Sequence, residues 1–322
     1  MVSDILLLSN EGLYCPAADF HIDPHRRVRN ALITHGHADH ARWGHERVLT
    51  SASGQAIVQH RVGPKTAVKG IPFGESFALG GARVSFHPAG HILGSAQIRL
   101  EVGGRVAVVT GDYKRGRDPT CEPFEPVACD LLVTETTFGL PIYRWPDPNE
   151  VAKKIDAWWA ANQMQGVNSL LLGYSLGKAQ RLLAMLNRDR GPILLHGAVL
   201  PFQKFYREAG IDLPDAHHVN AERLREASGR AMIVAPPSVV NTPWVRKLGA
   251  VRIAMASGWM LTRGQRRRAG YDAGFVISDH VDWPELLQTV EACQPAEIWA
   301  MHGQREAVAR YFQGRGFRTR VV

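Results

Sequence analysis

Cysteine is scarce in this chain, and long apolar runs are missing. The four cysteines among 322 residues form no CxxC pair and no dense framework, so we expect reduced thiols rather than disulfides or a zinc knuckle. They are Cys15, Cys121, Cys129 and Cys293. No stretch approaches the roughly 20 apolar residues of a membrane span, and acidic Asp4 before the short run 5–8 argues against a signal peptide. The sequence predicts a soluble cytoplasmic protein.

The composition is that of a basic globular protein. With 45% hydrophobic residues, the chain can bury a substantial core, as one large domain or two. The formal net charge is +8, and arginines occur in clusters. Examples are Arg26, Arg27 and Arg29, and later Arg263, Arg266, Arg267 and Arg268. This charge suggests a polyanionic partner such as nucleic acid, or else a solvated surface in an arginine-rich proteome.

Three imidazoles and a carboxylate occur between His35 and His40, directly after the apolar run 31–34. In an extended segment, residues two apart point the same way, so His35 and His37 can bind one ion. Asp39 and His40 fall on the following turn, where we expect a helix to begin, and can reach a second ion. Imidazole and carboxylate together suit zinc and similar divalent ions. The alternative is a polar cluster, or surface histidines, with no ligand.

The pattern of strands and helices changes once along the chain. Strands over 96–102 and 105–110 flank a Gly103-Gly104 hairpin turn, and another over 131–134 ends at Glu135. The proline-bearing stretch 141–148 marks a boundary. Beyond it the sequence predicts helices over 149–165 and 177–187 and strands over 168–172, 192–196, 231–235 and 251–255. This alternation predicts a small α/β region with a parallel sheet.

Two later strands, 275–278 and 297–301, are expected to resume the first domain, each delivering a histidine. The sequence therefore predicts a first domain made of 1–140 and 269–322. A smaller domain, 141–268, is inserted into it.

The motifs resemble a known family over nearly the whole chain. The order HxHxDH (35–40), Gly90-His91 and Gly111-Asp112 resembles the metallo-β-lactamase superfamily. Glu135, His280 and His302 lie in segments that resemble the three extra motifs of the β-CASP nucleases. These include the pre-mRNA cleavage endonuclease, ribonuclease J and the Artemis-type repair nucleases. The compact size and the Phe-His-Ile-Asp-Pro opening (20–24) most resemble bacterial exonucleases associated with ATP-dependent DNA ligases.

The resemblance implies a fold and two zinc ions, which manganese could replace. The fold would be an αββα metallo-β-lactamase sandwich with an inserted, smaller α/β β-CASP domain. The implied ligands are His35, His37, His91 and Asp112 for one ion, and Asp39, His40 and His302 for the other, with Asp112 bridging. Two metals can clamp the attacking and leaving oxygens of a phosphodiester. Asp112 could instead be an ordinary turn aspartate.

Catalytic roles follow from the same resemblance. Besides the ligand Asp39, it implies that His280 donates a proton to the leaving oxygen or neutralises charge there. Glu135 would orient His280, since a carboxylate fixes the imidazole tautomer. Asp23 would hold a ligand histidine. The alternatives are a surface strand end for Glu135, a helix cap for His280 and a turn before proline for Asp23.

Candidate substrate contacts lie in the inserted domain. Ser175, Gly177 and Lys178 occur where a strand gives way to a helix N-terminus, which is a natural anion site. Ser257 and Gly258 could offer a hydroxyl and backbone N–H groups to a terminal phosphate. Alternatively, these glycines only permit tight turns. A phosphate pocket here would suit an exonuclease that measures from a 5′ end.

The function implied by the resemblance is metal-dependent phosphodiester hydrolysis. We favour a 5′ to 3′ exonuclease in DNA repair that acts on DNA with a free end, with a functional link to a DNA ligase or helicase. An RNA-processing nuclease is the first alternative, because a histidine at the His302 position is more typical of RNA-acting members. A small-ester or thioester hydrolase is the second, although the inserted domain and the basic charge argue against it. Every metal ligand that the resemblance implies is present in the sequence, which disfavours a purely binding module without catalytic activity.

Overall fold

The chain divides into two compact units in the computed structural model, which describes residues 5–262 and 270–322. The first unit combines Met1–Arg144 with Asp279–Val322, and the second is Trp145–Ser278. The segment expected to be inserted, 141–268, overlaps the second unit over most of its length. The expected boundary at 268 and the arginine cluster of residues 263 and 266–268 lie outside the described residues.

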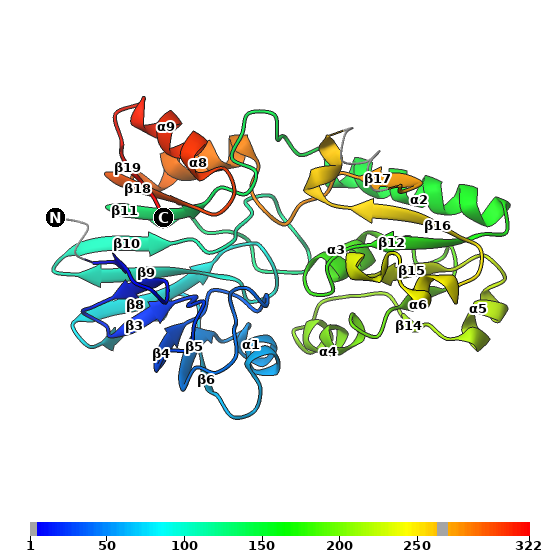
Figure 1. Ribbon diagram of the computed structural model, residues 1–322, viewed down its shortest axis with the longest axis horizontal. Coiled ribbons are helices and arrows are strands. Elements are labelled where there is room, and N and C mark those ends of the chain that lie inside the picture. Colours follow the sequence, from blue (N-terminus) through cyan, green and yellow to red (C-terminus); the bar gives the residue numbers. More distant parts are fainter. Residues whose placement is uncertain (1–4, 263–269) are drawn as a thin grey trace. The chain divides into compact units, whose positions relative to one another are not determined.

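Two sheets form the middle of the first unit (Figure 1). Within the described residues, the first sheet follows chain order: β1 (Leu7–Leu8), β2 (Leu13–Cys15), β3 (Phe20–Ile22), β4 (Asn30–Leu32), β5 (Arg47–Ser51) and β6 (Ala67–Ile71). The second has the order β19 (Arg318–Val321), β18 (Glu297–Met301), β11 (Leu131–Glu135), β10 (Arg105–Val109), β9 (Ala96–Val102), β8 (Ala82–Pro88) and β7 (Phe77–Leu79). The expected hairpin at Gly103-Gly104 joins β9 to β10 and is confirmed.

The alternation of buried residues explains how the layers stack. Leu32 and Leu49 pack against the second sheet, in a core that includes Phe86 and Trp299. Their neighbours Ala31 and Val48 face the other way, onto α1 (Gln55–Val62), because successive strand residues point to opposite faces. Helices α8 (Trp283–Cys293) and α9 (Arg305–Gln313) cover the outer face of the second sheet. The layers therefore run helix, sheet, sheet, helix, and the α/β class is confirmed.

The second unit is built on one parallel sheet. Its strands have the order β14 (His217–His218), β13 (Ile193–Leu195), β15 (Met232–Ala235), β12 (Asn168–Leu172), β16 (Val251–Ala256) and β17 (Ala273–Phe275). The described helices are α2 (Pro148–Met164), α3 (Lys178–Met185), α4 (Leu200–Glu208), α5 (Ala221–Ala227) and α6 (Pro243–Arg246). The Asp147 side chain caps α2 by accepting a hydrogen bond from Asn149 N. The expected parallel α/β region is present.

One strand was assigned to the wrong sheet. The segment 275–278 was expected to resume the first unit, but Phe275 ends β17, which pairs in parallel with β16 of the second unit. In the sequence, an edge strand of this kind is only a short apolar run, and such a run does not indicate which sheet the strand joins.

The strand ends of the first unit collect the polar residues of the motifs. Strands β10, β11 and β18 are neighbours and parallel, so their carboxyl ends lie at one edge of the sheet. Asp112 follows β10, Glu135 ends β11, and His302 follows β18. His35 follows β4 of the other sheet, and His91 follows β8. This edge therefore holds the candidate site.

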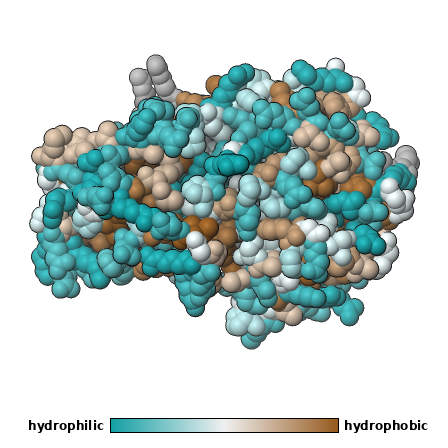
Figure 2. All heavy atoms as spheres, turned by 180° about the vertical axis from the view of Figure 1, so that it is seen from behind, coloured by the Kyte–Doolittle hydropathy of each residue, from teal (hydrophilic) through white to brown (hydrophobic). Residues whose placement is uncertain are grey.

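Hydrophilic side chains cover most of the molecular face drawn in Figure 2, and hydrophobic ones lie among them in small groups. A search of the described residues finds no helix with the length and hydropathy that a membrane span needs. Trp43 is a prominent exception to the polar surface, because 81% of its area is exposed.

Candidate metal centre

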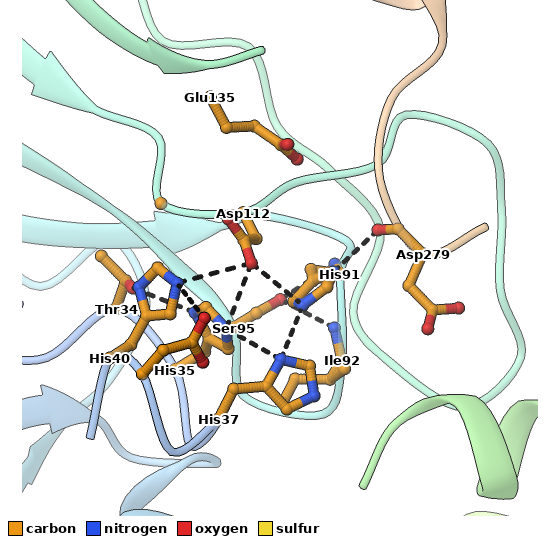
Figure 3. Close-up of polar contacts among 12 residues, drawn as sticks. Thr34, His35, His37, His40, His91, Ile92, Ser95, Asp112, Glu135 and Asp279 are labelled. Carbon is orange, nitrogen blue, oxygen red and sulfur yellow. Dashed lines mark hydrogen bonds and ion pairs between the residues drawn. The ribbon is translucent and has the colours of Figure 1, made fainter. Parts of the chain in front are cut away.

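Four potential ligand atoms converge at the shared edge of the two sheets. His35, His37, His91 and Asp112 each offer one, and these atoms all lie within 4.8 Å of one another. His37 Nδ1 lies 3.0 Å from His35 Nε2 and 3.1 Å from His91 Nε2. Figure 3 shows the imidazoles gathered around the Asp112 carboxylate. Three imidazoles and a carboxylate, mostly buried, form a donor set that suits zinc.

The hydrogen bond of His91 identifies which of its nitrogens is free for a cation. Its Nδ1 lies 2.8 Å from the backbone carbonyl oxygen of Asp279, which can only accept, so Nδ1 carries a proton. In the neutral ring Nε2 then presents a lone pair towards His37 Nδ1 and towards Asp112 Oδ2, which is 3.7 Å away. A lone pair directed at a carboxylate is repelled unless a proton or a cation lies between them. The geometry therefore fits a bound metal ion.

Burial keeps two of these imidazoles neutral. Burial, followed by the charges of neighbouring histidines, holds the pKa of His35 and of His91 well below the usual value. Neutral imidazole is the form that ligates metals. The two side chains are therefore available as ligands at neutral pH and below.

Asp112 lies between this cluster and a second set of polar side chains. Its Oδ2 is 3.6 Å from His35 Nε2 and 3.5 Å from His40 Nε2. Asp39 Oδ2 is 3.9 Å from the same His40 nitrogen, and the ring centroids of His40 and His302 are 5.9 Å apart. Asp39 and His302 are exposed, so this second set is more open than the first. Asp112 is placed where it can serve both sets.

The contacts of Asp23 fix the orientation of His40. Asp23 Oδ2 lies 2.8 Å from His40 Nδ1, so this nitrogen donates and Nε2 faces Asp112. Thr34 donates to the same carboxylate from its backbone nitrogen (2.8 Å) and its hydroxyl (2.5 Å). Burial alone would lower the pKa of His40, but Asp112 and Asp23 raise it well above the usual value. A cation bound at Nε2 would take the place of that extra proton.

The polypeptide does not form the expected helix after Asp39. Residues 38–40 form a turn closed by hydrogen bonds from His40 N (3.2 Å) and Ala41 N (2.8 Å) to the His37 carbonyl. This turn lets His40 approach both Asp112 (3.5 Å) and Asp39 (3.9 Å) with the same ring nitrogen, whereas a regular helix would rotate successive side chains by about 100°. The expectation of a helix here was wrong.

His280, which is partly exposed, pairs with the buried carboxylate of Glu135 beside Asp112. Nδ1 of His280 lies 2.8 Å and 2.9 Å from the two carboxylate oxygens of Glu135, which is fully buried. Glu135 also accepts hydrogen bonds from Tyr113 N (3.1 Å) and Thr137 Oγ1 (2.5 Å). Burial would lower the pKa of His280, but Glu135 and then Asp112 raise it to about 9. These carboxylates therefore favour the protonated form of His280.

The residues proposed for substrate contact lie at one edge of the parallel sheet in the second unit. Ser175 follows β12 and Ser257 follows β16, and these neighbouring strands are parallel with Leu172 opposite Met255. Lys178 is buried, and its Nζ donates to the Ile277 carbonyl oxygen (3.2 Å). Ser257 Oγ accepts from Trp259 N (3.3 Å), and Gly258 is buried beside it. The structure places Ser175 and Ser257 on the same edge but turns the Lys178 ammonium inward.

Sequence reasoning missed two groups that hold the site in place. Thr34 contacts Asp23, and its Oγ1 lies 3.0 Å from His35 Nδ1. The backbone carbonyl of Asp279 holds His91, 188 residues earlier in the chain. Thr34 stands directly before the histidine motif, so its position was a usable sign. A backbone carbonyl leaves no sign in the sequence.

Comparison with known proteins identifies several relatives, although no family model matches the chain. A protein of Opitutus terrae named "Probable DNA ligase" is 33% identical over 315 residues, which are 97% of this chain and 30% of that protein. An "RNase J-like protein" of Methanocaldococcus jannaschii is 27% identical over a stretch that covers 57% of this chain and 43% of that protein. "Cleavage and polyadenylation specificity factor 73" of Drosophila melanogaster is 31% identical over a stretch that covers 37% of this chain and 18% of that protein. The chain thus spans less than half the length of these curated relatives.

A solved structure supports the fold alone. A protein of unknown function from Enterococcus faecalis superposes with a TM-score of 0.62 at 12% identity, covering 91% of this chain and 78% of that chain. The sequence relatives include β-CASP proteins of the ribonuclease J and pre-mRNA cleavage types, and they confirm the resemblance carried by the motifs. The chain is therefore a homologue of the β-CASP nucleases of the metallo-β-lactamase superfamily.

Proposed function

We propose that the chain is a dinuclear-metal phosphodiesterase that degrades DNA from a free end, with 5′ to 3′ polarity favoured, in DNA repair. The observation that carries the proposal is the convergence of His35, His37, His91 and Asp112 within 4.8 Å, with His40 next to Asp112. We assign the first unit as the metallo-β-lactamase domain and the second as the β-CASP domain.

The residues present fit two divalent cations. His35, His37, His91 and Asp112 would hold one, and Asp39, His40 and His302 would hold the other, with Asp112 shared. Zinc, or manganese in its place, supplies Lewis-acid polarisation of a phosphate and a lowered pKa of bound water. The chain holds these ligands in register: Asp23 aligns His40, and the Asp279 carbonyl aligns His91. Such outer contacts fix ring orientation and tautomer.

His280 is the group best placed to give a proton to a leaving oxygen. Its pKa of about 9 means that it is protonated near pH 7, and its ring centroid is 4.8 Å from that of His91. Glu135 holds Nδ1, so the proton to be transferred is the one on Nε2. The 3′ oxygen left after phosphodiester cleavage would accept it.

DNA is favoured over RNA by the extent of the sequence match. The relative named as a DNA ligase aligns over 97% of this chain, whereas those with ribonuclease names align over 37–57%. The same match supports a functional link to a DNA ligase. An RNA-processing nuclease remains the second candidate, because relatives named as endoribonucleases match 37–38% of the chain at about 30% identity.

A terminal phosphate would bind at the carboxyl edge of the sheet in the second unit. From β12 the chain runs first to β13 on one side and later to β16 on the other, so the order reverses at β12. Ligands of open parallel sheets bind at such a reversal point. Ser175, Lys178, Ser257 and Gly258 are the proposed contacts, with Lys178 needing to release the Ile277 carbonyl first.

Two oligonucleotides of identical sequence test the proposal, one DNA and one RNA, each with a 5′ phosphate and a 3′ label. The wild-type chain with zinc or manganese should shorten the DNA in single-nucleotide steps, and His37→Ala should not. A matched 5′-hydroxyl DNA should be degraded more slowly. Preferential RNA cleavage would replace the DNA proposal with the RNA one. Absence of metal-dependent cleavage of both strands would refute the nuclease function.

A further inference from the structure

A basic cavity with an exposed tryptophan opens beside the metal-site loop. It has a volume of about 740 Å³, and its lining includes residues on both sides of Asp39 and His40 in the sequence. Its lining includes Trp43 and the four arginines Arg26, Arg27, Arg42 and Arg61, and none of the described residues that line it is acidic. Acidic groups do lie close by, since Glu46 Oε1 is 3.7 Å from Arg27 Nη2. The cavity thus combines an aromatic face with an excess of positive charge.

The loop presents Trp43 outward from a fixed base. Ala41 and His45, on either side, are buried. His45 Nδ1 accepts a hydrogen bond from Val28 N (3.3 Å), and its carbonyl oxygen accepts one from Thr66 Oγ1 (3.1 Å). The indole nevertheless remains 81% exposed. Exposing a large aromatic ring on an anchored loop is unfavourable in water, so a partner with an apolar flat face is the natural occupant.

This cavity shares two lining residues with a cavity at the metal site. A second cavity of about 700 Å³ is lined by Asp39, His40 and His302, and His25 and Arg42 line both cavities. Arg42 is tied to the loop by a bond from its Nε to the Asp39 carbonyl oxygen (3.3 Å). A chain molecule passing through the metal site can therefore extend onto Trp43 without leaving the protein surface.

We propose that the Trp43 cavity binds the single strand of the nucleic-acid substrate next to the bond that is cut. A base stacks on the Trp43 indole, while Arg26, Arg27 and Arg42 contact its flanking phosphates. Stacking on an aromatic ring tolerates every base, and arginines follow the backbone charge, which suits an enzyme without sequence preference. This inference rests on the proposed nuclease function, and it assigns the strand contacts within the first unit.

Binding measurements on the full chain test the site separately from cleavage. The affinity of a fluorescent 12-nucleotide single strand is measured by anisotropy in the presence of a chelator, so that the strand stays intact. An abasic strand of equal length keeps the phosphates and removes the stacking surface. Trp43→Ala should weaken binding of the normal strand about tenfold and that of the abasic strand less than twofold. Trp43→Phe should restore most of the loss.

The arginines have a control that is matched in charge. Arg26→Ala combined with Arg27→Ala should weaken the binding of both strands. It should also reduce the magnitude of the slope of log affinity against log salt concentration by about one to two. Arg83→Ala with Arg105→Ala removes the same charge from exposed positions on β8 and β10, and should leave the slope close to that of the wild type.

Two outcomes contradict the inference in distinguishable ways. If the wild type binds the normal strand but Trp43→Ala binds it equally well, the site is refuted and the nuclease function stands. If the wild type binds neither strand, and also cleaves neither DNA nor RNA with metal present, the proposed function falls together with the site.

Discussion

Replacing Asp23 by asparagine should weaken metal binding while leaving the backbone unchanged. Asp23 has a left-handed backbone (φ 43°), a conformation that asparagine tolerates better than most residues. Its carboxylate accepts hydrogen bonds from the Thr34 backbone and hydroxyl and holds His40 Nδ1 at 2.8 Å. An asparagine amide is neutral and offers one acceptor oxygen instead of two, so it cannot reproduce all three contacts.

The expected loss can be estimated from the role of this carboxylate. Removing a group that orients a ligand imidazole typically lowers metal affinity 10- to 100-fold, which is about 1.4 to 2.8 kcal/mol. The effect should fall on the set that contains His40, and the ion held by His35, His37 and His91 should be bound with nearly unchanged affinity. One of two binding steps should therefore weaken.

A zinc titration of the metal-free chain against a chromophoric chelator measures both steps. Asp19→Asn is the matched control, because Asp19 is also an aspartate with a left-handed backbone (φ 52°) but is exposed and contacts Tyr14 Oη at 2.9 Å. The control should bind zinc within about twofold of the wild type. Circular dichroism of both metal-free variants should match the wild type. Equal zinc affinities for the two variants would refute the role assigned to Asp23.

Three further predictions concern packing, proton transfer and metal removal. In urea denaturation, Gly111→Ala should lower the free energy of unfolding by about 1 to 3 kcal/mol more than Gly103→Ala. Both glycines have φ 56°, but a new Cβ would lie 2.7 Å from Thr34 Cβ at position 111 and would touch nothing within 4 Å at position 103. Equal losses for the two variants would show that the contact with Thr34 is unimportant. His280→Ala should slow cleavage by about 10² to 10⁴ with bound metal per chain unchanged, and a parallel loss of metal would instead indicate a structural role. Removing metal with a chelator should lower the melting temperature, and zinc should restore it, because ligands that bind only the folded state stabilise it; an unchanged melting temperature would argue against a site formed in the folded chain.

The local parts of the fold were predictable from the sequence. Strands over 96–102, 131–134 and 168–172 were recognised because each is a short apolar or alternating run bounded by turn residues, and the structure has strands at these places. The histidine motif at 35–40 was recognisable as a metal site because its ligand types are concentrated in six residues. Propensity and spacing act over a few residues, and these features need nothing more.

The non-local parts were not predictable in this way. A turn at residues 38–40 replaces the expected helix, because the contact of His40 with Asp112 is made by tertiary structure. The sheet that β17 joins depends on its pairing with β16. The hydrogen bond from His91 to the Asp279 carbonyl oxygen joins positions that are 188 residues apart. Each outcome depends on which strand ends meet, and a single sequence does not contain that information in local form.

The proposed mechanism requires the histidine and aspartate cluster to hold two metal ions that together permit DNA cleavage. The most direct test is a titration of the metal-free chain with zinc, in which bound metal and the cleavage rate of a 5′-phosphorylated DNA strand are followed on the same samples. We expect the rate to rise to a plateau at two equivalents per chain, and His37→Ala to show neither full occupancy nor cleavage. Cleavage that is independent of added metal, or equally fast in His37→Ala, would contradict the account.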